Sequence, residues 1–127
     1  MVILDTSVII DVSRKKKYAL ELIASYQEKE QIATTIITQY EMLRGTPEPY
    51  INYITDLLNR FVILDFGTDA LNETVKIYKK LKEKGTLINE LDIMIAGIAT
   101  TNNQTLITKD KDFQNLENNK IIILQKP

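Results

Sequence analysis

Four acidic side chains lie where a carboxylate could do chemistry. Asp5 closes an N-terminal apolar run and is followed at once by two hydroxyl residues, and Asp110 comes soon after another apolar run. Glu41 and Asp92 fall in segments with helical patterns, and the nearest neighbours of Asp92 are mostly apolar. A carboxylate among apolar side chains is costly to desolvate unless it is paired or bound to a cation. The pattern therefore favours a site for hard metal ions.

The composition narrows the chemistry further. The chain of 127 residues contains no Cys and no His. This removes disulfides, thiolate nucleophiles, the usual general base and the usual zinc ligand. Carboxylates, hydroxyls, lysines and hard ions such as Mg²⁺ or Mn²⁺ are what remains. Carboxylates that lie so close together repel each other and would recruit divalent cations. Two such ions can activate a water molecule to attack a phosphodiester.

The charge distribution allows two interpretations. The formal net charge is −1, which argues against binding of nucleic acid through overall charge alone. The basic residues are nevertheless unevenly placed, at 14–17 and at Lys76, Lys79, Lys80, Lys82 and Lys84. They either form solvated helix faces and ends, or form a surface that tracks phosphates beside the acidic site.

Each acid also has a structural interpretation. Asp5 could cap the helix that follows it. Thr38 and Glu41 have the spacing of a capping box, which would fail if the helix began at residue 36. Asp92 in a first helical turn is favoured by the helix dipole, and Asp110 is a common turn residue. No single acid decides the matter, but the four together favour a shared site.

The elements that would position these acids alternate along the chain. We expect strands at residues 2–4, 31–34, 61–64, 105–108 and 121–124. We expect helices from residue 6 or 7 onward and at residues 18–29, 36–44, 50–59, 71–84 and 90–101. This alternation predicts a three-layer α/β/α sandwich with a central, mostly parallel sheet, in one domain spanning residues 1–127. Strand ends would then bring Asp5 and Asp110 to one edge, where ligands bind in such sheets.

No apolar run approaches the roughly 20 residues that a membrane span needs. The N-terminus also lacks the basic region of a signal peptide. We therefore expect no membrane association and a cytoplasmic location.

Four motifs in this order resemble those of a known family. They are Leu4-Asp-Thr-Ser-Val-Ile-Ile-Asp11, Thr38-Gln-Tyr-Glu-Met-Leu-Arg-Gly45, Leu91-Asp-Ile-Met-Ile-Ala96 and Leu106-Ile-Thr-Lys-Asp-Lys-Asp-Phe113. Each motif alone is loose, but their order and spacing over nearly the whole chain are specific. The sequence resembles PIN-domain ribonucleases, and among them the VapC-like toxins of prokaryotic toxin–antitoxin pairs.

The resemblance implies a catalytic quartet of Asp5, Glu41, Asp92 and Asp110. Asp5, Asp92 and Asp110 would be the main ligands of Mg²⁺ or Mn²⁺, with Glu41 binding directly or through water. Thr6 and Thr108 would occupy the hydroxyl positions that contact substrate. The family cleaves RNA, and its members typically form homodimers that a cognate antitoxin silences.

Three alternatives stay open at the level of sequence. Asp112 could share or take the role of Asp110, and Glu90 lies near enough to Asp92 to touch an outer-shell water. The whole chain could also be a non-catalytic scaffold that binds RNA or a protein partner.

Overall fold

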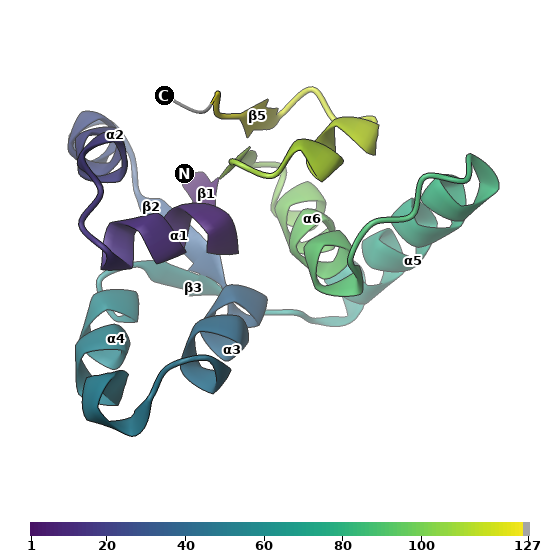
Figure 1. The fold of residues 1–127 in the computed structure, drawn as a ribbon. Helices are drawn as coiled ribbons and strands as arrows, with labels where there is room; N and C mark the ends of the chain where they lie inside the picture. The colour runs from purple at the N-terminus through teal and green to yellow at the C-terminus, as the bar shows by residue number, and fades with distance from the viewer. Residues whose placement is uncertain (126–127) are drawn as a thin grey trace.

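The computed structural model describes residues 1–125, in which strands and helices alternate (Figure 1). The strands are β1 (Val2–Leu4), β2 (Ile32–Thr35), β3 (Val62–Leu64), β4 (Thr105–Thr108) and β5 (Ile121–Ile123). The α-helices are α1 (Thr6–Ser13), α2 (Lys17–Gln27), α3 (Ile36–Arg44), α4 (Ile51–Leu58), α5 (Thr68–Glu83) and α6 (Glu90–Asn102). Two 3₁₀ helices, η1 (Glu48–Tyr50) and η2 (Lys111–Asn115), were not predicted.

All strand pairs of the sheet are parallel, in the order β3-β2-β1-β4-β5. The first strand is therefore the central one, with Ile3 paired to Ala33 on one side and to Leu106 on the other. Parallel strands align their carboxyl ends along one edge. The register therefore brings the residues that follow β1 and β4 next to each other.

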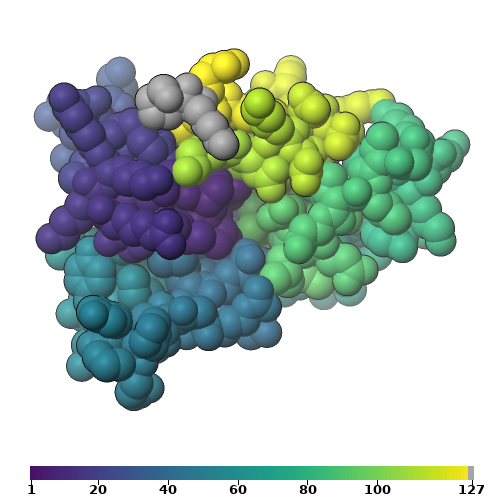
Figure 2. All heavy atoms as spheres, viewed as in Figure 1, coloured from purple at the N-terminus to yellow at the C-terminus, as the bar shows by residue number. Residues whose placement is uncertain are grey.

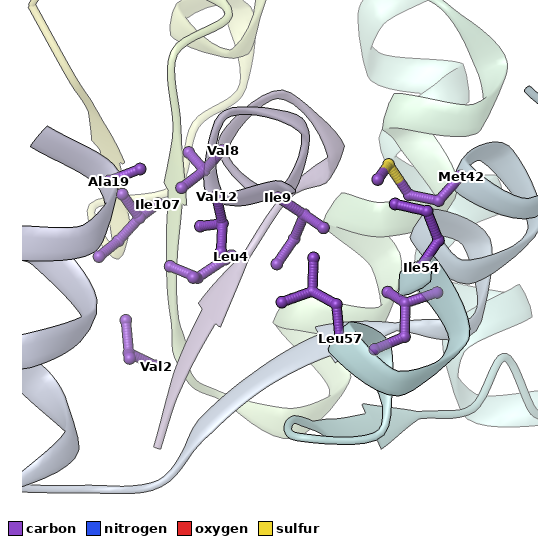
Figure 3. Close-up of a cluster of buried hydrophobic side chains, with 11 residues drawn as sticks. Val2, Leu4, Val8, Ile9, Val12, Ala19, Met42, Ile54, Leu57 and Ile107 are labelled. Atoms are coloured by element: carbon purple, nitrogen blue, oxygen red, sulfur yellow. The ribbon is translucent and has the colours of Figure 1, made fainter. Parts of the chain in front are cut away.

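The two faces of the sheet bury different side chains, because successive residues of a strand point to opposite sides. Val2 and Leu4 of β1 join α1, α2, α3 and α4 in one apolar cluster, part of which Figure 3 shows. Ile3 and Leu106 face the other way and pack with α6 and with Phe113 of η2. Helical elements thus cover both faces, which confirms the predicted three-layer α/β/α architecture.

The strand predicted at residues 61–64 is present as β3, but its apolar run is not buried as that of β1 is. β3 is half-buried along its whole length because it is the outermost strand and pairs only with β2. Its apolar sequence, Val62-Ile-Leu64, is as apolar as that of β1. Position within a sheet depends on distant pairing, so a short apolar run does not reveal it.

The start of α3 excludes the alternative that Thr38 and Glu41 form a capping box. Helix α3 begins at Ile36, and its N-cap is Thr35, whose hydroxyl accepts a hydrogen bond from the N–H of Thr38 at 3.1 Å. Glu41 therefore lies beyond the first turn, where its carboxylate has no capping role. This releases Glu41 for another function.

Helices α5 and α6 form a closely packed pair beside the sheet (Figure 1). Gly97 lies at the crossing, where a Cβ atom would meet the hydroxyl oxygen of Thr74 at 2.0 Å and the carbonyl oxygen of Ala70 at 3.0 Å. The missing side chain lets the two backbones approach. Within residues 1–125, neither these helices nor any other combine the length and apolar character of a membrane span.

Candidate active site

Asp5 follows β1 directly and is both the N-cap of α1 and a buried acid. Its Oδ1 accepts hydrogen bonds from the hydroxyl of Ser7 at 2.6 Å and from the N–H of Val8 at 3.2 Å. Its Oδ2 accepts one from the hydroxyl of Thr108. Burial raises the pKa of Asp5, more than these three bonds lower it. Since a carboxylate has about four lone-pair sites, one site on Oδ2 stays available.

Glu41 is held by the hydroxyl of Thr6, which is bonded in turn to the hydroxyl of Thr38. Thr6 of α1 donates a hydrogen bond to Oε1 of Glu41 at 2.7 Å, and its own oxygen lies 2.9 Å from the hydroxyl oxygen of Thr38. The single hydroxyl proton of Thr6 is directed at Glu41, so Thr38 is the donor in the second bond. Thr6 and Thr108, the hydroxyl positions predicted to contact substrate, thus both orient acids in this structure.

Asp92 lies in the first turn of α6, half-buried. Burial, followed by the charges of Asp110, Asp5, Glu41 and finally Asp112, raises its pKa to about 7. All four predicted acids are therefore close enough to interact, although they come from four separate elements of the chain. The charges of the other three acids all disfavour the ionised form of Asp92.

The structure favours Asp110 over Asp112 for the last position. Asp110 is half-buried, and its charge raises the pKa of both Asp5 and Asp92. It also caps η2, since its Oδ1 accepts a hydrogen bond from the N–H of Asp112 at 2.9 Å. Asp112 is exposed and acts only on Asp92. Glu90 is exposed as well, in the same helical turn as Asp92.

The chemistry of this donor set fits a hard divalent cation. Within residues 1–125, no group of three acidic side chains has the spacing needed to hold a metal ion without rearrangement. The donors are nevertheless carboxylates and hydroxyls, which suit Mg²⁺ or Mn²⁺ rather than softer metals. Four mutually repelling acids, one with its pKa at about 7, make a region that a cation would stabilise.

A second polar group beside these acids was missed by the sequence reasoning. Asp11 of α1 is buried and forms salt bridges with Lys16, at 3.3 Å, and with Lys109. Tyr18 donates a hydrogen bond to the same carboxylate, and the ammonium of Lys109 lies 5.8 Å from the centre of the Tyr18 ring. Burial would raise the pKa of Asp11, but the hydrogen bonds from Lys109, Tyr18 and Lys16 lower it on balance.

This group ties down the turn that carries Asp110. The N–H of Lys109 donates a hydrogen bond to the hydroxyl of Ser7 at 3.0 Å, and the N–H of Asp110 donates one to Thr108 at 2.9 Å. The side chain of Lys109 is held by its salt bridge to Asp11, so both its backbone and its side chain connect the turn to α1. The available signal was Asp11 itself, an acid among the apolar residues of α1, which resembles the setting of Asp92.

The comparisons with known proteins agree with the geometry. The PIN domain family model matches residues 2–119. Ribonuclease VapC1 of Methanocaldococcus jannaschii is 32% identical over 111 residues, which cover 87% of this chain and 76% of that protein.

Solved structures share the fold over nearly the whole length. VapBC2 from Rickettsia felis, bound to a promoter DNA fragment, superposes with a TM-score of 0.86 at 21% identity and covers 98% of both chains. DNA-bound VapBC from Salmonella typhimurium gives a TM-score of 0.85 at 25% identity, with 96% of both chains covered. The fold and the four acids are consistent with both matches. This chain therefore belongs to the PIN-domain family, among relatives of the VapC ribonucleases.

Proposed function

We propose that this protein is an Mg²⁺- or Mn²⁺-dependent endoribonuclease and the toxin of a toxin–antitoxin pair. One observation carries the proposal. Asp5, Glu41 and Asp110, from three other elements, lie close enough to Asp92 that their charges add to the effect of its burial, and together they raise its pKa to about 7. Such a concentration of negative charge is unfavourable in the protein alone and becomes favourable when a cation is bound. The relative named ribonuclease VapC1 supports the choice of RNA as substrate.

Asp5, Asp92 and Asp110 would hold the metal, with Glu41 binding directly or through water. A divalent ion bound there supplies charge stabilisation for a phosphodiester and lowers the pKa of a water. The protein's own residues orient the acids: Thr108 and Thr6 direct their hydroxyl protons at Asp5 and Glu41. We propose that the same two hydroxyls contact the RNA when it is bound.

The partners follow from the same proposal. An antitoxin is supported by solved structures that are of VapBC and share this fold. We propose a homodimer on the resemblance to VapC-like toxins. We also propose a cytoplasmic location, because the proposed substrate is RNA.

The direct test compares cleavage of a labelled, mixed-sequence RNA with Mn²⁺ and with EDTA. We expect Asp5→Asn to reduce cleavage about 100-fold or more, because several kcal/mol of charge stabilisation depend on the ion. Asp65→Asn is the matched control: Asp65 also follows an apolar strand but is exposed, and it is not among the acids that shift the pKa of Asp92. Circular dichroism would verify that both variants fold.

The outcomes separate the nuclease from a binding scaffold. Cleavage by Asp5→Asn at the wild-type rate would show that the four acids do not form the active site. The scaffold is favoured by one observation, that no three acids of residues 1–125 form a ready-made metal site. RNA binding by the wild-type protein without cleavage and without Mn²⁺ binding would establish that alternative.

Lys109 provides a prediction about positioning. We expect Lys109→Met to lower cleavage and Mn²⁺ affinity about tenfold, or about 1.4 kcal/mol, because the turn carrying Asp110 loses its anchor on Asp11. Lys109→Arg should restore both. Lys16→Met is the control, since Lys16 pairs with the same carboxylate but lies far from the turn in sequence. Equal losses in the Lys109→Met and Lys16→Met proteins would show that Asp11 only needs a neutralising charge.

A further inference from the structure

A cavity lies away from the four acids, between α5, the end of α6 and the segment that follows η2. Its volume is about 680 Å³, within the range that holds a small-molecule ligand. The space-filling view shows the yellow segment after η2 against the green end of α5, where Lys84 and Glu117 form a salt bridge (Figure 2). We call this the lysine cavity.

Four lysines line the cavity. Lys76 and Lys80 of α5 and its C-cap residue Lys84 follow one another at four-residue spacing, which places them about 6 Å apart along one helix face. Lys120 lines the cavity as well, and its ammonium donates a hydrogen bond to the carbonyl of Asn103 at 3.0 Å. The lining acids are Glu73 and Glu117, so the walls carry two more positive than negative charges, in a chain whose net charge is −1.

Both acids are paired with lining lysines, Glu73 with Lys76 at 3.4 Å and Glu117 with Lys84. The hydrogen bond from Lys84 lowers the pKa of Glu117, and the charge of Lys80 lowers it further. Lys80 and Lys120 therefore supply the excess positive charge of the lining. In residues 1–125, Lys80 itself has no salt bridge or side-chain hydrogen bond. Its ammonium can therefore receive an anion without breaking a contact.

The rest of the lining is of two kinds. Apolar side chains form part of the wall, and among them are Ile77, Leu81, Ala99 and Leu116. Carboxamides make up much of the remainder, namely Asn103, Gln104, Asn115, Asn118 and Asn119. Lysines bind phosphates, apolar surface accepts the flat face of a base, and carboxamides pair with base edges. One ligand that presents all three features is an unpaired nucleotide with its flanking phosphates.

The cavity also adjoins the elements that carry the acids. Helix α6 bears Asp92 in its first turn and lines the cavity with Thr100, about 12 Å further along the helix. Helix η2 is capped by Asp110 and ends at Asn115, another lining residue. A single RNA strand a few nucleotides long could therefore extend from one place to the other.

We propose that the lysine cavity is a second RNA-binding site, which holds one unpaired nucleotide of the substrate and its phosphates at a distance from the scissile bond. The proposal rests on the proposed ribonuclease function. It makes the cavity a contributor to substrate affinity and leaves the chemical step to the acids.

The test compares two charge-matched double variants of α5. Lys76→Gln/Lys80→Gln removes two charges from the cavity, whereas Lys79→Gln/Lys82→Gln removes two exposed charges that do not line it. Binding of a fluorescent single-stranded RNA would be followed by anisotropy in EDTA, where the proposed reaction cannot proceed. We expect about tenfold weaker binding for the first variant only. Its salt dependence should fall by about 1.4 in slope, about 0.7 for each lost phosphate contact.

Kinetics with Mn²⁺ give the second readout. The first variant should raise KM for a long RNA with kcat unchanged, and the control variant should change neither. Equal effects of the two variants would overturn the proposal, because bulk charge would then explain the binding. Unchanged RNA binding in the first variant would also overturn it, in favour of an acidic protein surface as the occupant. Because binding is measured without cleavage, a failure of the nuclease proposal is recognised separately, as binding without cutting.

Discussion

Asp92→Asn is expected to abolish metal-dependent RNA cleavage while making the metal-free protein more stable. Asp92 is one of the three proposed metal ligands, so its loss is expected to cost about 100-fold or more in rate. The same change removes a charge that burial and then Asp110, Asp5 and Glu41 disfavour. An amide of nearly equal size leaves the packing in place. Cleavage assays and thermal melts in EDTA measure the two effects.

The pH dependence gives the sign of the stability effect. The pKa of Asp92 is about 7 in the folded protein, against an ordinary value of 3.8. Between these values the folded chain holds a proton that the unfolded chain releases, so the free energy of unfolding decreases as pH rises from about 4 to 7. We expect Asp92→Asn in EDTA to be the more stable protein at pH 8, with a smaller advantage at pH 5. The control is Asp65→Asn, which should melt like the wild type.

Two results would contradict this prediction. A variant that melts below the wild type in EDTA at pH 8 would show that Asp92 is stabilised by contacts rather than repelled by its neighbours. Wild-type melting that does not respond to Mn²⁺, together with unchanged cleavage by the variant, would remove Asp92 from the site altogether.

Gly97→Ala is expected to lower the stability of the protein. The new methyl group would lie 2.0 Å from the Thr74 hydroxyl oxygen and 3.0 Å from the Ala70 carbonyl oxygen. Overpacking of this kind costs about 1–3 kcal/mol, which outweighs the gain of about 1 kcal/mol from replacing a helical glycine. Urea denaturation would measure the free energy of unfolding. Cleavage should fall as well, because α6 positions Asp92.

A second substitution tests the cause. Thr74→Ala removes the hydroxyl at 2.0 Å, although its hydrogen bond to Ala70 is lost too. The double variant should recover part of the stability lost in Gly97→Ala. If the double variant shows no recovery, the contact with Thr74 is not the source of the loss. Gly67→Ala is the comparison glycine, since nothing lies within 4 Å of a Cβ atom there.

Much of the fold could be predicted because local patterns were strong. The bounds of β1, α3 and β4 match the expected ranges, since each follows or precedes a clear change between apolar and polar residues. Gly45 and the prolines after it marked the end of α3. The parallel arrangement followed from the alternation of strands and helices.

The features that the sequence did not predict depend on contacts between residues far apart in the chain. The half-buried state of β3 follows from its place at the sheet edge, and the engagement of Lys109 follows from Asp11, which is far away in sequence. The site itself shows the same division. The types of the acids predicted their chemistry, but the bond from Thr6 to Glu41 needed the packing of α1 against α3.

The order of the acids along the chain has a consequence for folding. Gly67, in the exposed link between β3 and α5, divides the site evenly: Asp5 and Glu41 precede it, and Asp92 and Asp110 follow it. A folding intermediate in which only one half is structured would hold two acids and no complete site. Activity should therefore arise in a single step with the pairing of β1 and β4. Cleavage of the chain at this link would separate the acids into two pairs, so neither fragment would carry the complete set.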